Sequence, residues 1–322
     1  MKKRLCLCAC CLLLVSSTAC GSSSTTEPDR SHREIKLSVS SVPTESIQVS
    51  SSSAPSTAAV PSSSDLTRIP KAEQLPLYMQ NNPKLYANLL ENVMTLYYAG
   101  LLSGRVNSDV FTPRYARDVL PPPDASPQER KKMADYCTIG GALEFFGCDT
   151  SNTLQYWEMY NGTLPYFCYD RDAHIYPKET APANHVLTLT SFDQTLYFVF
   201  RYTNNDTINR AALSYAAQNI DSYVKHYYHA IENGTLTDSQ SYPHTADVLP
   251  VSGASAEERH RCAENATIIG AIDAAGFYTV YAPYITSLGY NKKSSLFTLP
   301  DFHNPDIIAL PSADTPLSFL HF

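Results

Sequence analysis

Apolar residues recur at helical spacing in two segments of the chain, and a glycine follows each segment. The first covers residues 85–101 and precedes Gly104, and the second covers 213–231 and precedes Gly234. Spacings of three and four residues put side chains on one face of a helix, and glycine readily adopts the left-handed conformation that often ends one. The pattern predicts two amphipathic helices, each ending at its glycine.

A further helix follows each of these, and a capping box marks its start. Residues 126–129 and 255–258 each place a serine three residues before a glutamate, so that the two side chains cap each other's backbone amides. Gly147 and Gly276 are predicted to end these helices about twenty residues later. Small residues recur within both helices and indicate a face packed closely against a neighbour. They are Thr138, Gly141 and Ala142, matched by Thr267, Gly270 and Ala271.

Aromatic and β-branched residues then replace the helical pattern and predict strands. Asn161-Gly162, a pair favoured in tight hairpins, separates the first two of them. The predicted strands cover residues 153–160, 163–169, 186–190 and 195–202 in the first half, and 277–285, 296–299, 307–310 and 317–322 in the second. Residues 203–209, rich in Asn, Asp and Thr, are interpreted as the joint between the halves.

The two halves resemble one another in sequence. Asp118-Val119-Leu120-Pro121 recurs as Asp247-Val248-Leu249-Pro250 at an offset of 129. Of the 30 residues from 118 to 147, 14 match those from 247 to 276, where chance gives about two. The order of elements predicts an α+β fold of two tandem homologous domains, residues 76–203 and 208–322. Each has two helices followed by an antiparallel sheet of three or four strands.

The N-terminus has the pattern of an export signal. Residues 2–4 are basic and precede eleven largely apolar residues, 5–15, a run too short to span a bilayer. Residues 17–21, Ser-Thr-Ala-Cys-Gly, resemble the lipobox of bacterial lipoproteins, with serine where that family usually has leucine. The resemblance implies a signal peptide of residues 1–19 and a lipid on the sulfur of Cys20. The alternatives are a looser match at residues 7–10 and an ordinary secretory peptide cut near Ala19.

The segment after Cys20 has the composition of a disordered tether. Residues 21–64 contain 16 Ser, 4 Thr and 4 Pro among 44 positions and hardly any large apolar side chain. Such a stretch cannot bury enough surface to offset its ordering entropy, so residues 20–70 are predicted to be the lipidated cysteine and its tether. The predicted location is the extracellular face of the cell membrane, with the membrane as a partner through the N-terminal lipid.

Charge and cysteine usage exclude several classes of partner and cofactor. Loss of residues 2–4 removes 3 of 24 basic residues and moves the net charge from −7 to −10, which argues against nucleic acid as a partner. The cysteines after Cys20 do not occupy equivalent positions in the two halves, so neither a shared disulfide framework nor a repeated metal site is predicted, and no cofactor is expected. One disulfide, such as Cys148 with Cys168, is left open. These cysteines are Cys137, Cys148, Cys168 and Cys262.

Two Asp-x-His pairs are the main candidates for catalysis. Asp172 with His174 and Asp301 with His303 stand 129 residues apart, and on a strand both side chains of a pair would share one face. Such a pair could ligate a metal or transfer a proton. His226 and His229 stand one helical turn apart and could bind zinc, with His260 and Cys262 as further ligands. The alternative interpretation takes all of them as ordinary polar side chains.

The 22 tyrosines are a hint of binding surfaces, because Tyr supplies amphipathic contact area and stacks on sugars. Most of them are expected in the core or on the sheets, and Trp157 stands alone where glycan binders often carry several tryptophans. Residues 219–234 and 276–278 loosely resemble the globular domains of pilin-like proteins of Gram-positive bacteria, although that family's cleavage site and apolar stem are missing. We predict a non-catalytic surface lipoprotein that binds an envelope protein or a glycan, or is structural in the envelope. The alternative is an extracytoplasmic hydrolase or metal-dependent enzyme that uses an Asp-x-His pair.

Overall fold

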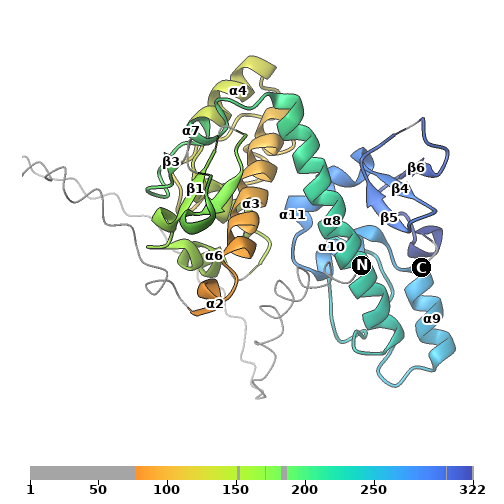
Figure 1. Cartoon of the computed structure of the whole chain (residues 1–322). Helices are drawn as coiled ribbons and strands as arrows, with labels where there is room; N and C mark the ends of the chain where they lie inside the picture. The colour runs from red at the N-terminus through yellow and green to blue at the C-terminus, as the bar shows by residue number, and fades with distance from the viewer. Residues whose placement is uncertain (1–76, 151–152, 171, 183–186, 302, 321–322) are drawn as a thin grey trace, which may run out of the picture. The chain divides into compact units, whose positions relative to one another are not determined.

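The computed structural model in Figure 1 describes residues 77–322, except 151–152, 171, 183–186, 302 and 321–322. The predicted signal segment, Cys20 and the tether lie outside the described residues. The described part consists mainly of helices, with two antiparallel sheets of three strands each. The predicted α+β class is therefore confirmed.

The first half contains one long helix, several short helices and one sheet. Helix α3 ends at Gly104, whose φ of 79° gives the left-handed cap predicted for it. The elements are helices α2 Leu77–Gln80, α3 Pro83–Ser103, α4 Pro127–Tyr136, α5 Ile139–Phe146, α6 Thr153–Tyr160 and α7 Leu196–Phe200, the short 3₁₀ helices η3 Leu164–Tyr166 and η4 Lys178–Thr180, and strands β1 Phe167–Tyr169, β2 Ile175–Pro177 and β3 Leu187–Thr188.

The second half repeats this order of elements. Its long helix α8 begins at Asn205, because the Asn204 side chain accepts a hydrogen bond from the Thr207 amide, 2.8 Å away, so most of the predicted joint is helical. The elements are helices α8 Asn205–Glu232, α9 Ala256–Asn265, α10 Ile268–Ala274 and α11 Tyr278–Tyr281, the 3₁₀ helices η5 Ala282–Ser287 and η6 Leu317–Leu320, and strands β4 Gly289–Asn291, β5 Leu296–Thr298 and β6 Ile307–Ala309.

The two sheets have the same topology. The first strand is central in each, so the orders are β2-β1-β3 and β5-β4-β6, with every pair antiparallel. Cys168 lies opposite Tyr176 and Thr188, and Tyr290 lies opposite Phe297 and Ile308. Each sheet therefore arises within one half, and no strand of one half pairs with a strand of the other among the described residues.

A partly buried network centred on an aspartate occurs in both halves; we call it the carboxylate hub. In the first half Asp118 accepts hydrogen bonds from the Tyr97 hydroxyl at 2.9 Å, the Thr138 amide at 3.0 Å and the Thr138 hydroxyl at 2.8 Å. Its counterpart consists of Asp247, Tyr227 and Thr267, with distances of 3.0, 2.9 and 2.8 Å for the same three bonds. The hub ties the long helix to the start of a later helix.

The hub explains the small residues that recur in both halves. A Cβ atom on Gly141 would lie 1.7 Å from an oxygen of Asp118, and one on Gly270 would lie 1.9 Å from an oxygen of Asp247. Such separations are impossible, so only glycine leaves space for the carboxylate. The predicted packing face is confirmed, and the group it packs against is the hub.

The hub also corrects the prediction of one long second helix in each half. Thr138 and Thr267 have extended backbones and cap new helices, because their hydroxyls accept from the amides of Gly141 and Gly270 at 3.1 Å. Helices α4 and α9 therefore end just before these threonines, and α5 and α10 begin just after them. The serine caps at the starts of α4 and α9 are confirmed, although the reciprocal bond from the glutamate is present only in α4.

Several predicted strands are wrong. Residues 153–160 form helix α6 instead, and Asn161-Gly162 ends that helix instead of turning a hairpin. Tertiary contacts override the β-propensity of this segment, since Tyr156 packs on Phe146, Trp157 on Phe192 and Tyr160 on Phe167 along the helix. The segments 195–202, 277–285 and 317–322 likewise contain helical turns in their described residues, while β2 and β4 were not predicted.

The other predicted strands are confirmed in part. Strands β5 and β6 lie inside 296–299 and 307–310. Strand β1 occupies only the end of 163–169, after η3, and β3 covers two residues of 186–190.

The two halves pack against each other mainly through helix α3 and helix α8. The Tyr284 hydroxyl donates to the Leu96 carbonyl at 3.0 Å, and an Arg105 nitrogen donates to the Ser287 hydroxyl at 2.8 Å. All described residues thus belong to one compact unit, and the division into two domains stays a prediction. None of the described helices combines the length and the apolar character needed to cross a membrane.

Candidate functional site

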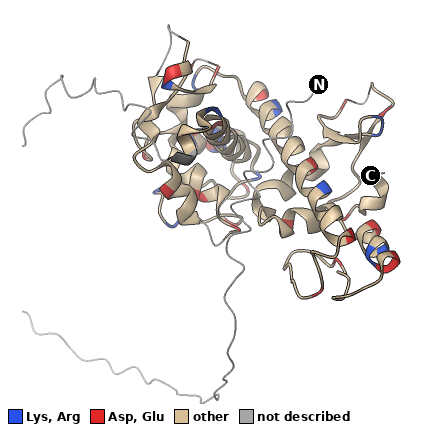
Figure 2. Cartoon of the chain, turned by 60° about the horizontal axis from the view of Figure 1, so that its bottom comes forward, with Lys and Arg blue, Asp and Glu red and all other residues tan. Residues whose placement is uncertain are grey.

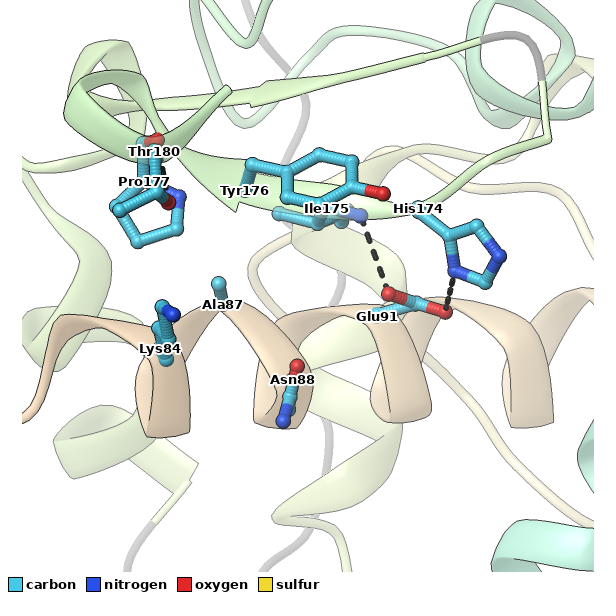
Figure 3. Close-up of a pocket in the computed structure, with 9 residues that line it drawn as sticks. All are labelled: Lys84, Ala87, Asn88, Glu91, His174, Ile175, Tyr176, Pro177 and Thr180. Carbon is cyan, nitrogen blue, oxygen red and sulfur yellow. Dashed lines mark hydrogen bonds and ion pairs between the residues drawn. The ribbon is translucent and has the colours of Figure 1, made fainter. Parts of the chain in front are cut away.

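His174 lies at a groove of about 250 Å³ between helix α3 and strand β2 (Figure 3). Ala87, Ile175 and Pro177 contribute its apolar surface, and Lys84, Asn88 and Thr180 are exposed residues along it. Glu91 reaches from α3 to the strand, where it accepts from the Ile175 amide and pairs with Nδ1 of His174, both at 3.1 Å (Figure 3).

Glu91 ties three elements together. Besides its bonds to β2, its carboxylate accepts from the Tyr215 hydroxyl of α8 at 2.8 Å. The Glu91 carboxylate therefore occupies the Ile175 amide of the edge strand β2. An edge strand whose amides are occupied in this way is less able to pair with another chain. The groove is also smaller than the usual range for ligand pockets, about 300–1,000 Å³. We therefore interpret Glu91 and His174 as a structural clamp.

The two Asp-x-His pairs do not occupy equivalent places, although they stand 129 residues apart in sequence. Asp172 and His174 lie in the turn between β1 and β2, where their backbone amides both donate to the Asp170 carboxylate, at 2.9 and 3.2 Å. Asp301 and His303 lie between β5 and β6, where the Asp301 carboxylate accepts from the His303 amide at 3.1 Å. None of the four is on a strand, and all four are exposed.

The histidines considered for zinc meet a carboxylate instead. His260 pairs with Glu232 at 2.9 Å, and His229 lies 3.9 Å from the other oxygen of the same carboxylate. Glu232 thereby raises the pKa of His260. Neither His226 nor Cys262 joins them, and the described residues contain no group of three His, Cys, Asp or Glu arranged to hold a metal ion.

The four cysteines of the described part are free thiols, so the disulfide left open between Cys148 and Cys168 is not formed. Burial raises the pKa of the Cys137 and Cys148 thiols, and raises that of Cys168 to about 11. These three groups are protonated at neutral pH, and a protonated thiol is a poor nucleophile.

The larger cavity has a volume of about 620 Å³ and lies where the two halves meet; we call it the junction cavity. Hydroxyl groups are its most frequent polar feature, and one of them, on Thr279, belongs to the second half. It is lined by Val110, Phe111, Thr112, Arg114, Tyr115, Glu144, Cys148, Asp149, Thr150, Thr153, Leu154 and Thr279.

Two carboxylates build the walls of the junction cavity. Glu144 is only 2 % exposed and accepts from three consecutive amides of the loop that holds Arg114, with distances of 3.0 Å to the Tyr115 amide and 2.9 Å to the Ala116 amide. Asp149 accepts from both the amide and the hydroxyl of Thr279, which joins the halves. Both acids are thus occupied in holding the walls.

The rim presents side chains that the fold leaves open to solvent. Tyr115 is 50 % exposed, with its ring 6.1 Å from Trp157, which in turn packs 4.4 Å from Phe192. Arg114 is exposed, and its guanidinium forms no ion pair with any described residue. Val110 and Leu154 add exposed apolar surface. An aromatic ring, a free cation and hydroxyl groups therefore surround one opening.

The second half has different side chains at this place. His244 takes the position of Tyr115, since its amide donates to the buried Asp273 at 2.7 Å, as the Tyr115 amide does to Glu144. Its ring pairs with Asp273 at 2.9 Å and stacks on Tyr278 at 3.9 Å. Pro243 stands where the first half has Arg114. The second half thus lacks both the tyrosine and the arginine of the rim.

The junction cavity was not predicted from the sequence, apart from the suggestion that some tyrosines mark binding surfaces. Its parts come from a loop, two helix ends and the other half of the chain, so no local motif identifies it. A scan against protein-family models, a search of curated proteins and a search of solved structures each found no match to this chain.

Proposed function

We propose that this chain is a lipid-anchored, non-catalytic binding protein of the bacterial envelope, and that the junction cavity is its binding site. The main support for this proposal is the cavity itself. Its volume of about 620 Å³ lies within the usual range for ligand sites, and such sites occur preferentially where domains meet. The residues at its rim have no role in the core that would explain them.

Binding accounts for the junction cavity better than catalysis does. Its carboxylates already accept hydrogen bonds from Tyr115, Ala116 and Thr279, and its thiol, Cys148, is protonated at neutral pH because burial raises its pKa. A hydrolase built on Asp172 and His174 would need the pair to converge, whereas His174 pairs with Glu91. General acid–base chemistry requires such convergence.

The anchor and the duplication belong to the same proposal. The lipobox-like residues around Cys20 and the serine-rich segment after it support attachment to the membrane through a tether, at the extracellular face. The identities between residues 118–147 and 247–276, together with the repeated carboxylate hub and sheet topology, support two tandem domains that arose by duplication. A tether of this length would let the binding site search the space above the lipid surface.

Retention of native envelope material tests the binding function. The full-length chain, purified in detergent and immobilised, should retain a component of envelopes from the bacterium that makes it, and Tyr115→Ala should abolish that retention. Tyr197→Ala is the matched control, because Tyr197 is also 50 % exposed but lies on α7 away from the cavity lining. Equal retention by wild type and Tyr115→Ala would contradict the proposed site.

A further inference from the structure

We infer that the ligand of the junction cavity is a saccharide that carries a carboxylate; this inference rests on the binding function proposed above. Three chemical features around one opening point to this class. They are an exposed aromatic ring, a set of hydroxyl groups and a single unpaired guanidinium.

The aromatic ring suits the apolar face of a sugar. Tyr115 exposes half of its surface, and its ring lies 6.1 Å from that of Trp157, which is itself packed against Gly140 and Phe192. Tyrosine has only two side-chain torsions to restrict on binding, and aromatic side chains provide large contact area with a polar edge. The Thr153 hydroxyl donates to the Gly147 carbonyl at 2.6 Å and can still accept a hydrogen bond, whereas the Thr112 hydroxyl can both donate to and accept from sugar hydroxyls.

One guanidinium at the rim is available to pair with a carboxylate, although Glu144 and Asp149 also line the cavity. The acids of the lining, Glu144 and Asp149, are occupied by backbone amides and by Thr279, which leaves Arg114 as the charged group free to meet a ligand. A guanidinium matches a carboxylate with two parallel hydrogen bonds. A polyphosphate would need several cations, whereas the chain has a net charge of −7 and its acidic and basic residues are interspersed (Figure 2).

The comparison of the two halves predicts one site per chain. The position of Tyr115 is filled in the second half by His244, whose ring already stacks on Tyr278, and the position of Arg114 is filled by Pro243. Neither a free ring face of the same kind nor a cation is available there. A cavity of about 620 Å³ accommodates a ligand of roughly disaccharide size.

Calorimetric titration of the full-length chain in detergent tests the ligand class. The probes are oligosaccharides that contain glucuronate, galacturonate, N-acetylmuramate or sialate, each beside its neutral methyl ester. We expect at least one acid to bind with one ligand per chain, more weakly as its ester and more weakly in high salt. Arg114→Gln should weaken binding of the acid by about tenfold or more and leave binding of the ester unchanged. Arg117→Gln is the matched control, because Arg117 is also exposed but lies outside the lining.

The outcomes separate this inference from the function on which it rests. Acids and esters that bind equally, or an Arg114→Gln variant that binds the acid as wild type does, would overturn the carboxylate assignment. Failure of every saccharide, with envelope retention still dependent on Tyr115, would overturn the ligand class and leave the binding function standing. Retention that does not depend on Tyr115 would overturn both.

Discussion

The carboxylate hub gives the sharpest prediction for stability. A methyl group at Gly270 would lie 1.9 Å from an oxygen of Asp247 and 3.1 Å from the Tyr227 hydroxyl. The carboxylate cannot simply rotate away, because it accepts from the amide and the hydroxyl of Thr267 as well as from Tyr227. Gly270→Ala must therefore shift helix α10 or break part of the hub.

The magnitude follows from three opposing effects. Replacing a helical glycine by alanine favours the helix by about 1 kcal/mol. Overpacking a buried site typically costs about 1–3 kcal/mol, and loss of one hydrogen bond to a charged group costs about 1.5–3 kcal/mol. The unfavourable effects exceed the favourable one, so we expect Gly270→Ala to lower the free energy of unfolding by about 2–4 kcal/mol.

A double-mutant cycle identifies the cause. Urea unfolding followed by circular dichroism would compare Gly270→Ala, Asp247→Ala and the double variant. Because the clash is with the Asp247 carboxylate, Gly270→Ala should become neutral or stabilising once that carboxylate is gone. An equal loss of stability in both backgrounds would refute the clash as the cause. Gly141→Ala with Asp118→Ala provides the same cycle in the first half, where the clash distance is 1.7 Å.

Three further predictions concern the anchor, the helix caps and the tyrosines. Metabolic labelling with a palmitate analogue should mark the wild type but not Cys20→Ala, and a label that persists would exclude lipidation at that residue. Ser255→Ala should cost about 1 kcal/mol in urea unfolding, since the serine hydroxyl accepts from the Glu258 amide at 3.2 Å, and a neutral effect would show that this cap is unimportant. Burial raises the pKa of four core tyrosines, so above pH 10 they lose their protons in the unfolded chain while they stay protonated in the folded chain. The free energy of unfolding should therefore fall by about 1.4 kcal/mol per pH unit for each tyrosine. The four are Tyr97, Tyr98, Tyr227 and Tyr284. In an absorbance titration they should ionise only as the chain unfolds. Ionisation near pH 10 in the folded chain would contradict their burial.

The sequence predicted the elements whose signals are local. Helix α3 and its end at Gly104 follow from apolar spacing and from a glycine with positive φ, and the starts of α4 and α9 follow from serine caps. The break at Thr138 could not be predicted, because the side chain that stabilises it, Asp118, lies 20 residues upstream. Helix α6 was misread because tyrosine and tryptophan favour strands, whereas their partners here are Phe146, Phe192 and Phe167 in distant segments.

The candidate sites depend even more on distant residues. His174 was singled out for the aspartate two positions before it, but its partner is Glu91, which lies 83 residues away in sequence. Likewise, the loop that carries Tyr115 is positioned by Glu144, 29 residues away. The repeat offset nevertheless holds information here, since Glu144 and Asp273 are both acidic, both buried and both bound to the same loop amide.

The residues discussed here that are identical in the two halves hold the fold together, with one exception. Asp118, Thr138, Gly141 and their counterparts form the hub, and Arg130 and Arg259 each donate from Nε to the last turn of the long helix, at 3.0 and 2.7 Å. Val119 and Val248, however, are identical although 72 % and 78 % exposed. Nothing in the contacts of the described residues explains this pair.

Difference between the halves, by contrast, coincides with the proposed binding site. The carboxylates of Glu144 and Asp273 hold the same loop in both halves, so the backbone that presents Tyr115 or His244 is fixed by the fold while the side chain is free to vary. In the proposed duplication, a position of this kind lets the two halves keep the same backbone while only the first half keeps the side chains of a binding site. The contribution of Thr279 to the junction cavity fits this division, because the second half then completes the site of the first.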